Sequence, residues 1–229
     1  MNCWICGNKA GSGEHLVKAS DIQSRLGGVS PNNPIFIHTK EHRNRREAGI
    51  KSRKLKFDVP MCAPCNNERT QPYDMAWERL STYLCSRNPP IQYGDKIRLH
   101  RVFPGSVKSS MLDVHLFFVK GFGCKIVEGD APIDLKPFAK ALLRRQPHPS
   151  LYIAICPQLD SRIDILGHSE LYANNDVRTG RSISASWLYY LDLVTVRIMY
   201  IDPSRQTGEI VDTWHPTNVT KIMRIEKVY

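Results

Sequence analysis

The sequence predicts an α+β protein built from two parts, residues 1–88 and residues 91–229. The first part is polar and basic, and it contains many turn-forming residues. The composition changes at Asn88-Pro89-Pro90, where consecutive prolines indicate a loop between elements. Beyond this boundary, segments rich in branched and aromatic residues outnumber helical ones, which predicts a mainly antiparallel sheet.

Four elements are predicted in the first part. Residues 14–18 and 34–38 are short strand candidates. Ser20-Asp21-Ile22-Gln23 looks like a capping box, which predicts a helix that ends at Gly27-Gly28. A second helix starts near Pro72, because apolar residues then recur three and four positions apart. These residues are Tyr73, Ala76, Trp77, Leu80, Tyr83 and Leu84.

The second part shows no catalytic motif, and we predict one helix and five strands in it. The helix spans residues 134–145. The strands are rich in branched and aromatic side chains and cover residues 97–103, 151–156, 162–166, 186–201 and 209–214.

The composition is that of an ordinary soluble globular protein, with 41% hydrophobic and 24% charged residues. These fractions exclude a disordered tail, a collagen-like repeat and a coiled coil. No apolar run approaches the roughly 18 residues that suggest a membrane span. Residues 1–4 have neither the basic leader nor the apolar core of a secretory signal. We therefore expect a cytoplasmic protein without a membrane partner.

The charge balance favours a polyanionic partner. The chain has 32 Lys and Arg against 22 Asp and Glu, a formal charge of +10, and such an excess suits nucleic acid, with DNA expected. Residues 40–56 hold eight of these cations against Glu41 and Glu47. This basic run is interpreted as a phosphate-contacting loop, and the alternative is a solvated loop. The residues expected to contact phosphates are Arg45, Arg46, Arg53 and Lys54.

Seven cysteines fall into two kinds. Cys85, Cys124 and Cys156 stand alone among apolar neighbours and are expected in the core. The other four form two CxxC pairs, Cys3 with Cys6 and Cys62 with Cys65. Because zinc prefers four tetrahedral ligands and binds thiolates, the two pairs predict a closed, structural zinc site. The alternative is four unrelated reduced cysteines.

A second group of polar residues follows the CxxC pairs. Glu14-His15 comes after the first pair, and Asn66 and Arg69 come directly after the second. A zinc ion shared by the pairs would draw these segments together. Glu14 and Asn66 offer oxygen ligands for a hard divalent cation, and a neutral His15 can take a proton from water. Arg69 can hold a phosphate by a two-pronged contact. The set therefore suits hydrolysis of a phosphodiester bond.

At these residues the chain resembles the zinc-stapled branch of the HNH endonucleases, the ββα-metal nucleases. The resemblance covers residues 1–86 and implies a structural zinc, a catalytic Mg²⁺ or Mn²⁺ ion and cleavage of nucleic acid. It matches His15 to the general base, Glu14 to the adjacent metal ligand and Asn66 to the last metal ligand. The chain departs from the pattern before the second CxxC, where the family has a bracing Asn and this chain offers only Asp58, and at Lys18, where the family often has Pro.

The sequence leaves three alternatives open. Glu41-His42 is a second acid-histidine pair, although it lies in the basic run. Without the bracing Asn, the chain could be a non-catalytic zinc-ribbon protein that binds nucleic acid. It could also be a subunit that depends on a partner protein. Since one such module cuts one strand, cleavage of both strands would need a homodimer or a second visit.

Overall fold

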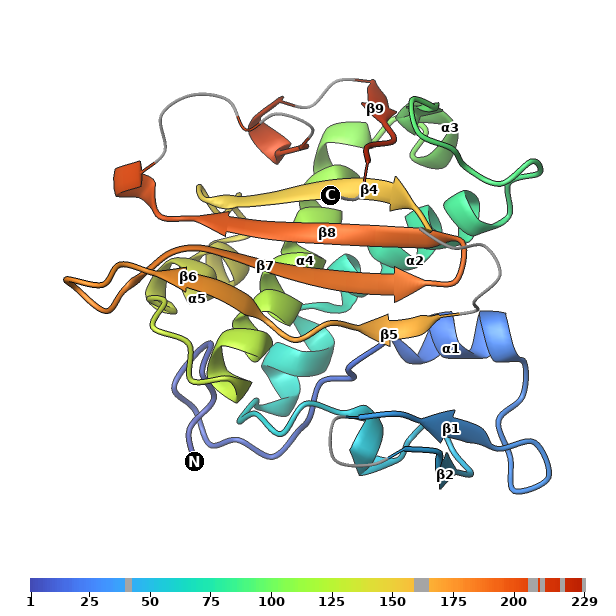
Figure 1. The fold of residues 1–229 in the computed structure, drawn as a ribbon, viewed down its shortest axis with the longest axis horizontal. Helices are drawn as coiled ribbons and strands as arrows, with labels where there is room; N and C mark the ends of the chain where they lie inside the picture. Colours follow the sequence, from blue (N-terminus) through green and yellow to red (C-terminus); the bar gives the residue numbers. More distant parts are fainter. Residues whose placement is uncertain (40–42, 159–164, 206–209, 211–212, 219–220, 228–229) are drawn as a thin grey trace.

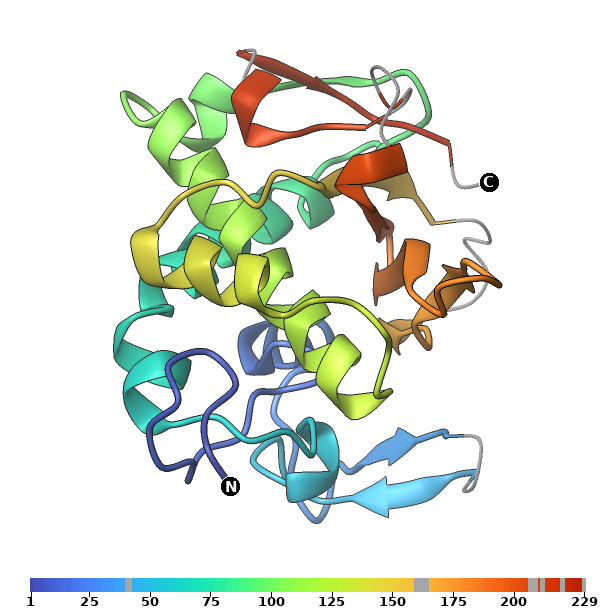
Figure 2. The ribbon, with the colours of Figure 1, turned by 90° about the vertical axis from the view of Figure 1, so that its left-hand side faces the viewer.

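A layer of helices covers one face of a five-stranded sheet (Figures 1 and 2). The computed structural model describes residues 1–229 except 40–42, 159–164, 206–209, 211–212, 219–220 and 228–229. Its helices are α1 (Ala19–Leu26), α2 (Gln71–Cys85), α3 (Leu99–Val102), α4 (Val107–Glu128) and α5 (Lys136–Arg144). Its strands are β1 (Ile35–Ile37), β2 (Arg45–Glu47), β3 (Lys96–Arg98), β4 (Leu151–Pro157), β5 (Leu166–His168), β6 (Tyr172–Asn175), β7 (Ser182–Leu191), β8 (Val194–Ile201) and β9 (Ile222–Arg224).

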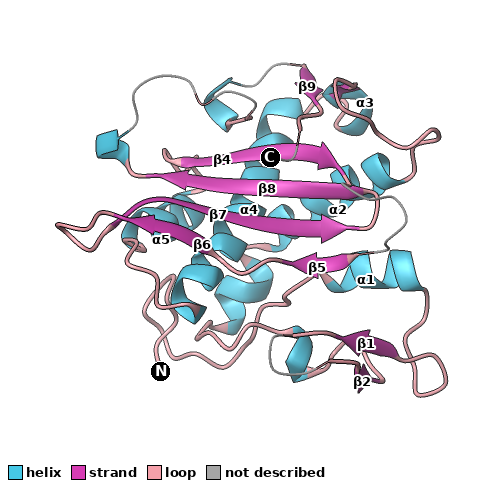
Figure 3. Ribbon diagram, viewed as in Figure 1, coloured by secondary structure: helices cyan, strands magenta, loops and turns pink. Residues whose placement is uncertain are grey.

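The main sheet has the strand order β4-β8-β7-β5, and β6 also pairs with β7. Figure 3 shows this sheet in magenta in front of the cyan helices. Every strand pair among the described residues is antiparallel, which confirms the predicted α+β class. Along β7, Ala185, Trp187, Tyr189 and Leu191 are buried and alternate with half-buried residues. This period of two turns one face of the sheet toward the helices.

Several predicted boundaries were wrong. The strand predicted at 186–201 is two strands, because Asp192 adopts a positive φ of 55° in the turn between β7 and β8. The strand predicted at 97–103 ends at Arg98 and continues as α3. Residues 162–164 of the strand predicted at 162–166 lie outside the described residues, and β5 begins at Leu166. Of the strand at 209–214, only residues 210, 213 and 214 are described, and Trp214 bridges Ile153.

Helix α4, the central helix of the structure, was not predicted from the sequence. Its side chains from Asp113 to Ile126 are buried, because α2 packs on one side and the sheet on the other (Figure 2). A helix that is buried all round shows no amphipathic period. The three- and four-residue spacing of apolar residues that predicted α2 is therefore absent from α4.

Helix α1 was predicted, but it starts differently from the prediction. Its N-cap is Lys18, and no side chain caps it. Asp21 points inward instead and accepts hydrogen bonds from Trp77 Nε1 (3.0 Å), Ser81 Oγ (3.0 Å) and Tyr189 Oη (2.9 Å). The Asp21 carboxylate, which was expected in a capping box, is thus hydrogen-bonded by three donors from α2 and β7. The predicted C-terminal end at Gly27, with a φ of 70°, is confirmed.

One hydrophobic core crosses the predicted boundary between the two parts. The cluster of buried apolar residues runs from Cys3 to Ile225. At its centre, Trp77 of α2 stacks on Phe117 of α4 with ring centres 5.6 Å apart, and it meets Phe118 edge-on at 4.7 Å. Side chains from both predicted parts therefore pack in one core. Whether the two parts fold independently, as the division at residues 88–91 implies, stays a prediction.

The N-terminal loop contacts α4 at a glycine. A Cβ atom added at Gly123 would lie 2.3 Å from the ring of Trp4, which comes from the first CxxC pair. Gly121, two residues earlier, faces Trp187 of β7 in the same way at 3.0 Å. Both glycines therefore let an indole approach the helix backbone, one from the loop and one from the sheet.

We expect Gly123→Ala to destabilise the protein by about 1–3 kcal/mol, the usual cost of overpacking. This would reverse the gain of about 1 kcal/mol that Ala normally brings to a helix. Denaturant unfolding of Gly123→Ala, Trp4→Ala and the double variant measures the coupling. In the Trp4→Ala background the glycine change should cost nothing. Gly28→Ala, which meets only open space, is the control, and an equal loss in both backgrounds would contradict the contact.

Candidate metal centre and adjoining polar site

The two CxxC pairs meet in the structure. The sulfur atoms of Cys3, Cys6, Cys62 and Cys65 all lie within 4.8 Å of one another, the only such group of three or more potential ligands among the described residues. Cys3 N donates to Asn8 O (2.7 Å), and Gly7 N donates to Cys3 O (2.8 Å), which closes the first loop. Four thiol ligands at this spacing fit a zinc ion. The prediction that these cysteines form one group is confirmed.

Two antiparallel segments and a helix surround this cysteine cluster. Residues 11–16 run beside residues 55–61, with bridges between Ser12 and Met61 and between His15 and Lys56. The bonds Leu16 N to Leu55 O and Phe57 N to Glu14 O are both 2.8 Å. The chain then enters a π-helical turn, η2 (Pro64–Glu68), and continues into α2. The strand predicted at 14–18 is thus a single bridged position.

Asn66 joins the turn after the second CxxC to the segment before His15. Its Nδ2 donates to Ser12 Oγ (2.9 Å) and to Gly13 O (3.1 Å). Its Oδ1 is buried and has no hydrogen-bond partner among the described residues. A buried acceptor left without a partner costs about 1–3 kcal/mol, so this oxygen is suited to a ligand.

His15, two residues after Gly13, carries a second unpaired atom. Its Nε2 is buried, and no described residue bonds it. Burial lowers the pKa of His15, and the charge of Lys56 lowers it further. The ring is therefore neutral near pH 7 and can accept a proton. The structure thus brings His15 and Asn66 to adjoining segments, as the sequence predicted.

Glu14 is engaged by a residue that was not predicted to belong to the site. Its Oε2 lies 3.0 Å from Nζ of Lys120 on α4. Burial raises the pKa of Glu14, and the positive charge of Lys120 opposes that shift. Lys120 also bonds Asp74 Oδ1 (2.9 Å). In the sequence, Lys120 is a single lysine inside the apolar run 116–122. Because a charged residue is rarely buried without a partner, this position could have indicated a buried ion pair.

Arg69 lies against the cysteine cluster. Its Nη1 donates to Cys65 Sγ at 3.2 Å, and such a bond stabilises a thiolate. Its predicted contact with phosphate stays a prediction. Asp58, considered for the bracing role, is exposed and pairs with Arg53 at 3.1 Å, so it does not brace the loop in this structure.

The described part of the basic run forms a hairpin and a short turn at the edge of the molecule (Figure 1). In the β1–β2 hairpin, Phe36 lies opposite Arg46 and is 56% exposed. Two cations pair with Glu47, namely Arg45 and Lys54. The four predicted contact residues Arg45, Arg46, Arg53 and Lys54 are all exposed. The rival pair Glu41-His42 lies outside the described residues.

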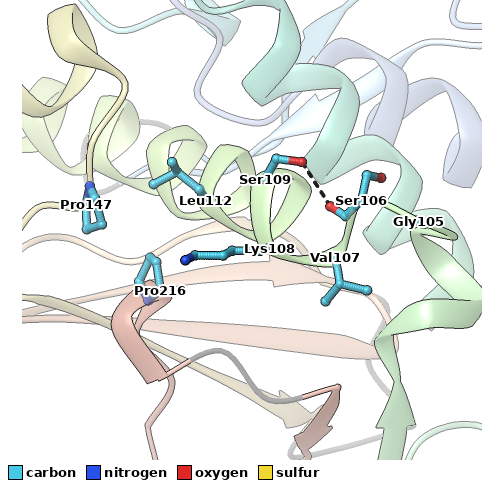
Figure 4. Close-up of a pocket in the computed structure, with 8 residues that line it drawn as sticks. All are labelled: Gly105, Ser106, Val107, Lys108, Ser109, Leu112, Pro147 and Pro216. Carbon is cyan, nitrogen blue, oxygen red and sulfur yellow. Dashed lines mark hydrogen bonds between the residues drawn. The ribbon is translucent and has the colours of Figure 1, made fainter.

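A surface hollow of about 460 Å³ lies beside the first turn of α4 (Figure 4). Pro147 and Pro216 face this turn across the hollow, and Ser109 Oγ donates to Ser106 O at 3.1 Å. Lys108, the charged residue of its lining, precedes Lys120 by twelve residues. At 1.5 Å per residue this is about 18 Å along the helix. The hollow is therefore separate from the polar site.

Three buried histidines form another group of titratable side chains. His148 N donates to His115 Nε2 (3.1 Å), and His215 Nε2 bonds His148 O (2.8 Å). Burial lowers the pKa of all three, that of His148 to about 3. Neutral rings near pH 7 pack against aromatic neighbours such as Trp214. These residues act as core.

No protein-family model, curated protein or solved structure matches the chain. None of the helices among the described residues is long and apolar enough to cross a membrane. The function of the chain must therefore be inferred from the geometry of the cysteine cluster and the polar site.

We expect the purified protein to carry about one zinc ion per chain. Cys62→Ser should lose the metal and unfold residues around the cluster, because metal binding and folding are coupled in such sites. Elemental analysis and circular dichroism measure both effects. Cys85→Ser removes a thiol outside the cluster and should keep the metal. A folded wild-type protein without bound zinc would contradict the assignment.

Proposed function

We propose that the chain is a metal-dependent endonuclease of the HNH type that hydrolyses phosphodiester bonds in nucleic acid, with DNA as the expected substrate. The observation that carries the proposal is the pair of buried, unpartnered atoms, His15 Nε2 and Asn66 Oδ1, on segments joined beside the cysteine cluster. Two antiparallel segments followed by a helix support the ββα-metal arrangement that the sequence suggests.

The residues divide into distinct roles under this proposal. His15 takes a proton from the attacking water at Nε2, since a neutral imidazole is a base suited to neutral pH. Glu14 and Asn66 offer oxygen ligands for one Mg²⁺ or Mn²⁺ ion. Such an ion supplies positive charge to the phosphate and the leaving oxygen. A zinc ion held by the four cysteines would have no free coordination position, so it would hold the two segments together and take no part in the reaction.

The nearby surface suits a polyanionic substrate. Arg45, Arg46, Arg53 and Lys54 are exposed on segments that lead into residues 55–61, which pair with the His15 segment. Because these cations lie on segments that lead into the His15 segment, they can hold the phosphates on either side of the cleaved bond. Arg69, on the cysteine cluster, is a further candidate for a phosphate contact.

A second function is favoured by one contact. Because the Lys120 ammonium already neutralises Glu14, a divalent ion has a competitor at that carboxylate. A zinc-ribbon protein that binds nucleic acid without cutting it needs only the cysteine cluster and the basic surface. It can also act as a subunit of a larger assembly or as a homodimer.

Cleavage tests separate these functions. His15→Ala should fold, keep zinc and bind nucleic acid like the wild type, yet cut about a hundredfold more slowly, the scale of lost proton transfer. Asn66→Ala should lose cleavage that higher Mg²⁺, or Mn²⁺, partly restores, because it removes a ligand. Plasmid nicking with and without EDTA, at several metal concentrations, measures both.

His42→Ala is the matched control for the histidine, and it should cut at nearly the wild-type rate. Loss of cleavage in His42→Ala with normal cleavage in His15→Ala would move the site to the rival pair. If the wild-type protein cuts neither DNA nor RNA with any divalent ion, the binding function replaces the enzyme.

The basic surface has its own test. Replacing Arg45, Arg46, Arg53 and Lys54 by Ala, together with Glu47→Gln so that no buried carboxylate is left unpaired, should weaken binding to all sequences alike. It should also flatten the dependence of log affinity on log salt by about 0.9 for each phosphate that the variant no longer binds. Fluorescence anisotropy of labelled DNA over a salt series measures the slope.

The control variant carries the same change in charge elsewhere. Lys136, Lys140 and Arg144 on α5 are exposed, and changing all three to Ala also lowers the net charge by three. This variant should keep the wild-type slope. Equal slopes for the two variants would mean that the basic run contributes only to the overall charge.

A further inference from the structure

Lys120 is a buried cation at the candidate site. It extends from the middle of α4, and its side chain is only 1% exposed. Nζ makes three polar contacts, to Glu14 Oε2 (3.0 Å), Asp74 Oδ1 (2.9 Å) and Thr70 Oγ1 (3.3 Å). A buried ammonium is tolerated only when opposite charges and hydrogen bonds compensate it, and these contacts supply that compensation.

The contacts of Lys120 reach both sides of the polar site. Glu14 lies on the segment that carries His15. Thr70, on the other side, donates from Oγ1 to the main-chain oxygen of Asn66 (2.9 Å). One ammonium thus connects the acid-histidine segment directly, and the Asn66 turn through one hydroxyl. The loss of this connection would free both segments at once.

Lys120 also sets the charge around Glu14. Two carboxylates and one ammonium give this group a net charge of −1, whereas the carboxylates alone would give −2. Like charges close together in a buried site repel strongly, because little water screens them. A second cation at Glu14 therefore meets repulsion from the ammonium that already contacts the same carboxylate.

We propose that Lys120 is a positioning residue of the candidate site, which holds the Glu14 carboxylate in place and weakens binding of a divalent cation beside it. The Lys120 ammonium and the metal ion then compete for the Glu14 carboxylate, and this competition lowers the affinity of the site for metal. The proposal rests on the proposed function only in naming the ion, and its test measures binding of metal rather than cleavage of nucleic acid.

The central experiment compares Mn²⁺ binding to the zinc-loaded wild-type protein and to Lys120→Met, which keeps most of the length of the side chain and removes the charge. Isothermal titration calorimetry should show at least tenfold tighter binding to Lys120→Met. Mn²⁺ should also raise the melting temperature of this variant more than that of the wild type, because the metal pairs the two partly buried carboxylates that have lost their ammonium partner. Unchanged or weaker Mn²⁺ binding in Lys120→Met would overturn the proposal.

Further variants locate the effect. Lys120→Met with Glu14→Gln should lose the gain in affinity, since the carboxylate is gone. Lys18→Met removes another cation, one that pairs with Glu78 and bonds Asp74 only at its main-chain oxygen, and it should change Mn²⁺ affinity less than threefold. A gain in Lys18→Met equal to that in Lys120→Met would mean that net charge alone is responsible, and the proposal would fail.

Folding defects are controlled by a double variant. Lys120→Met with Asp74→Asn leaves one carboxylate at the group instead of two, so it keeps the wild-type charge of −1 there. If Lys120→Met does not fold, this double variant replaces it and should still bind Mn²⁺ more tightly than the wild type, because the ammonium beside Glu14 is absent. Wild-type affinity there would overturn the proposal. If Lys120→Met binds Mn²⁺ more tightly but the wild-type protein cuts no nucleic acid, the nuclease is rejected and the competition between Lys120 and the metal at Glu14 is retained.

Discussion

The ammonium of Lys120 is the interaction on which the arrangement of the polar site depends. Helix α4 is buried on nearly all sides, and a charge in its middle is tolerated only because Glu14 and Asp74 reach it. Since burial of an unpaired ion costs several kcal/mol, the three groups fix one another. The loop before α2, the segment of Glu14 and the central helix are thereby held in one arrangement.

Local signals in the sequence predicted the parts that local chemistry determines. The two CxxC pairs indicated one metal centre, because together they supply the four thiolates that a structural zinc takes. The spacing of Tyr73, Trp77 and Leu80 indicated α2. His15 and Asn66 were also predicted to lie together, since a shared zinc site requires their segments to meet. The hydrogen bonds from Asn66 to Ser12 and Gly13 could not be predicted.

Features that depend on distant residues were not predictable in the same way. Asp21 was expected to cap its own helix, but Trp77 and Tyr189 donate to it from elsewhere in the fold. Helix α4 has no amphipathic period because it is covered on both sides. Lys120 stands out only as a charge in an apolar run, and nothing local identifies Glu14 as its partner. Long-range pairing decides each of these cases.

The same long-range pairing sets the order in which the protein can be completed during translation. Glu14 leaves the ribosome long before Lys120, and Asp21 waits for Tyr189 of β7. At about 5–20 residues per second, the acid-histidine segment remains without its buried partner for about 5–20 s. A nascent chain therefore carries Glu14 without its ammonium partner until the middle of the printed sequence has been translated.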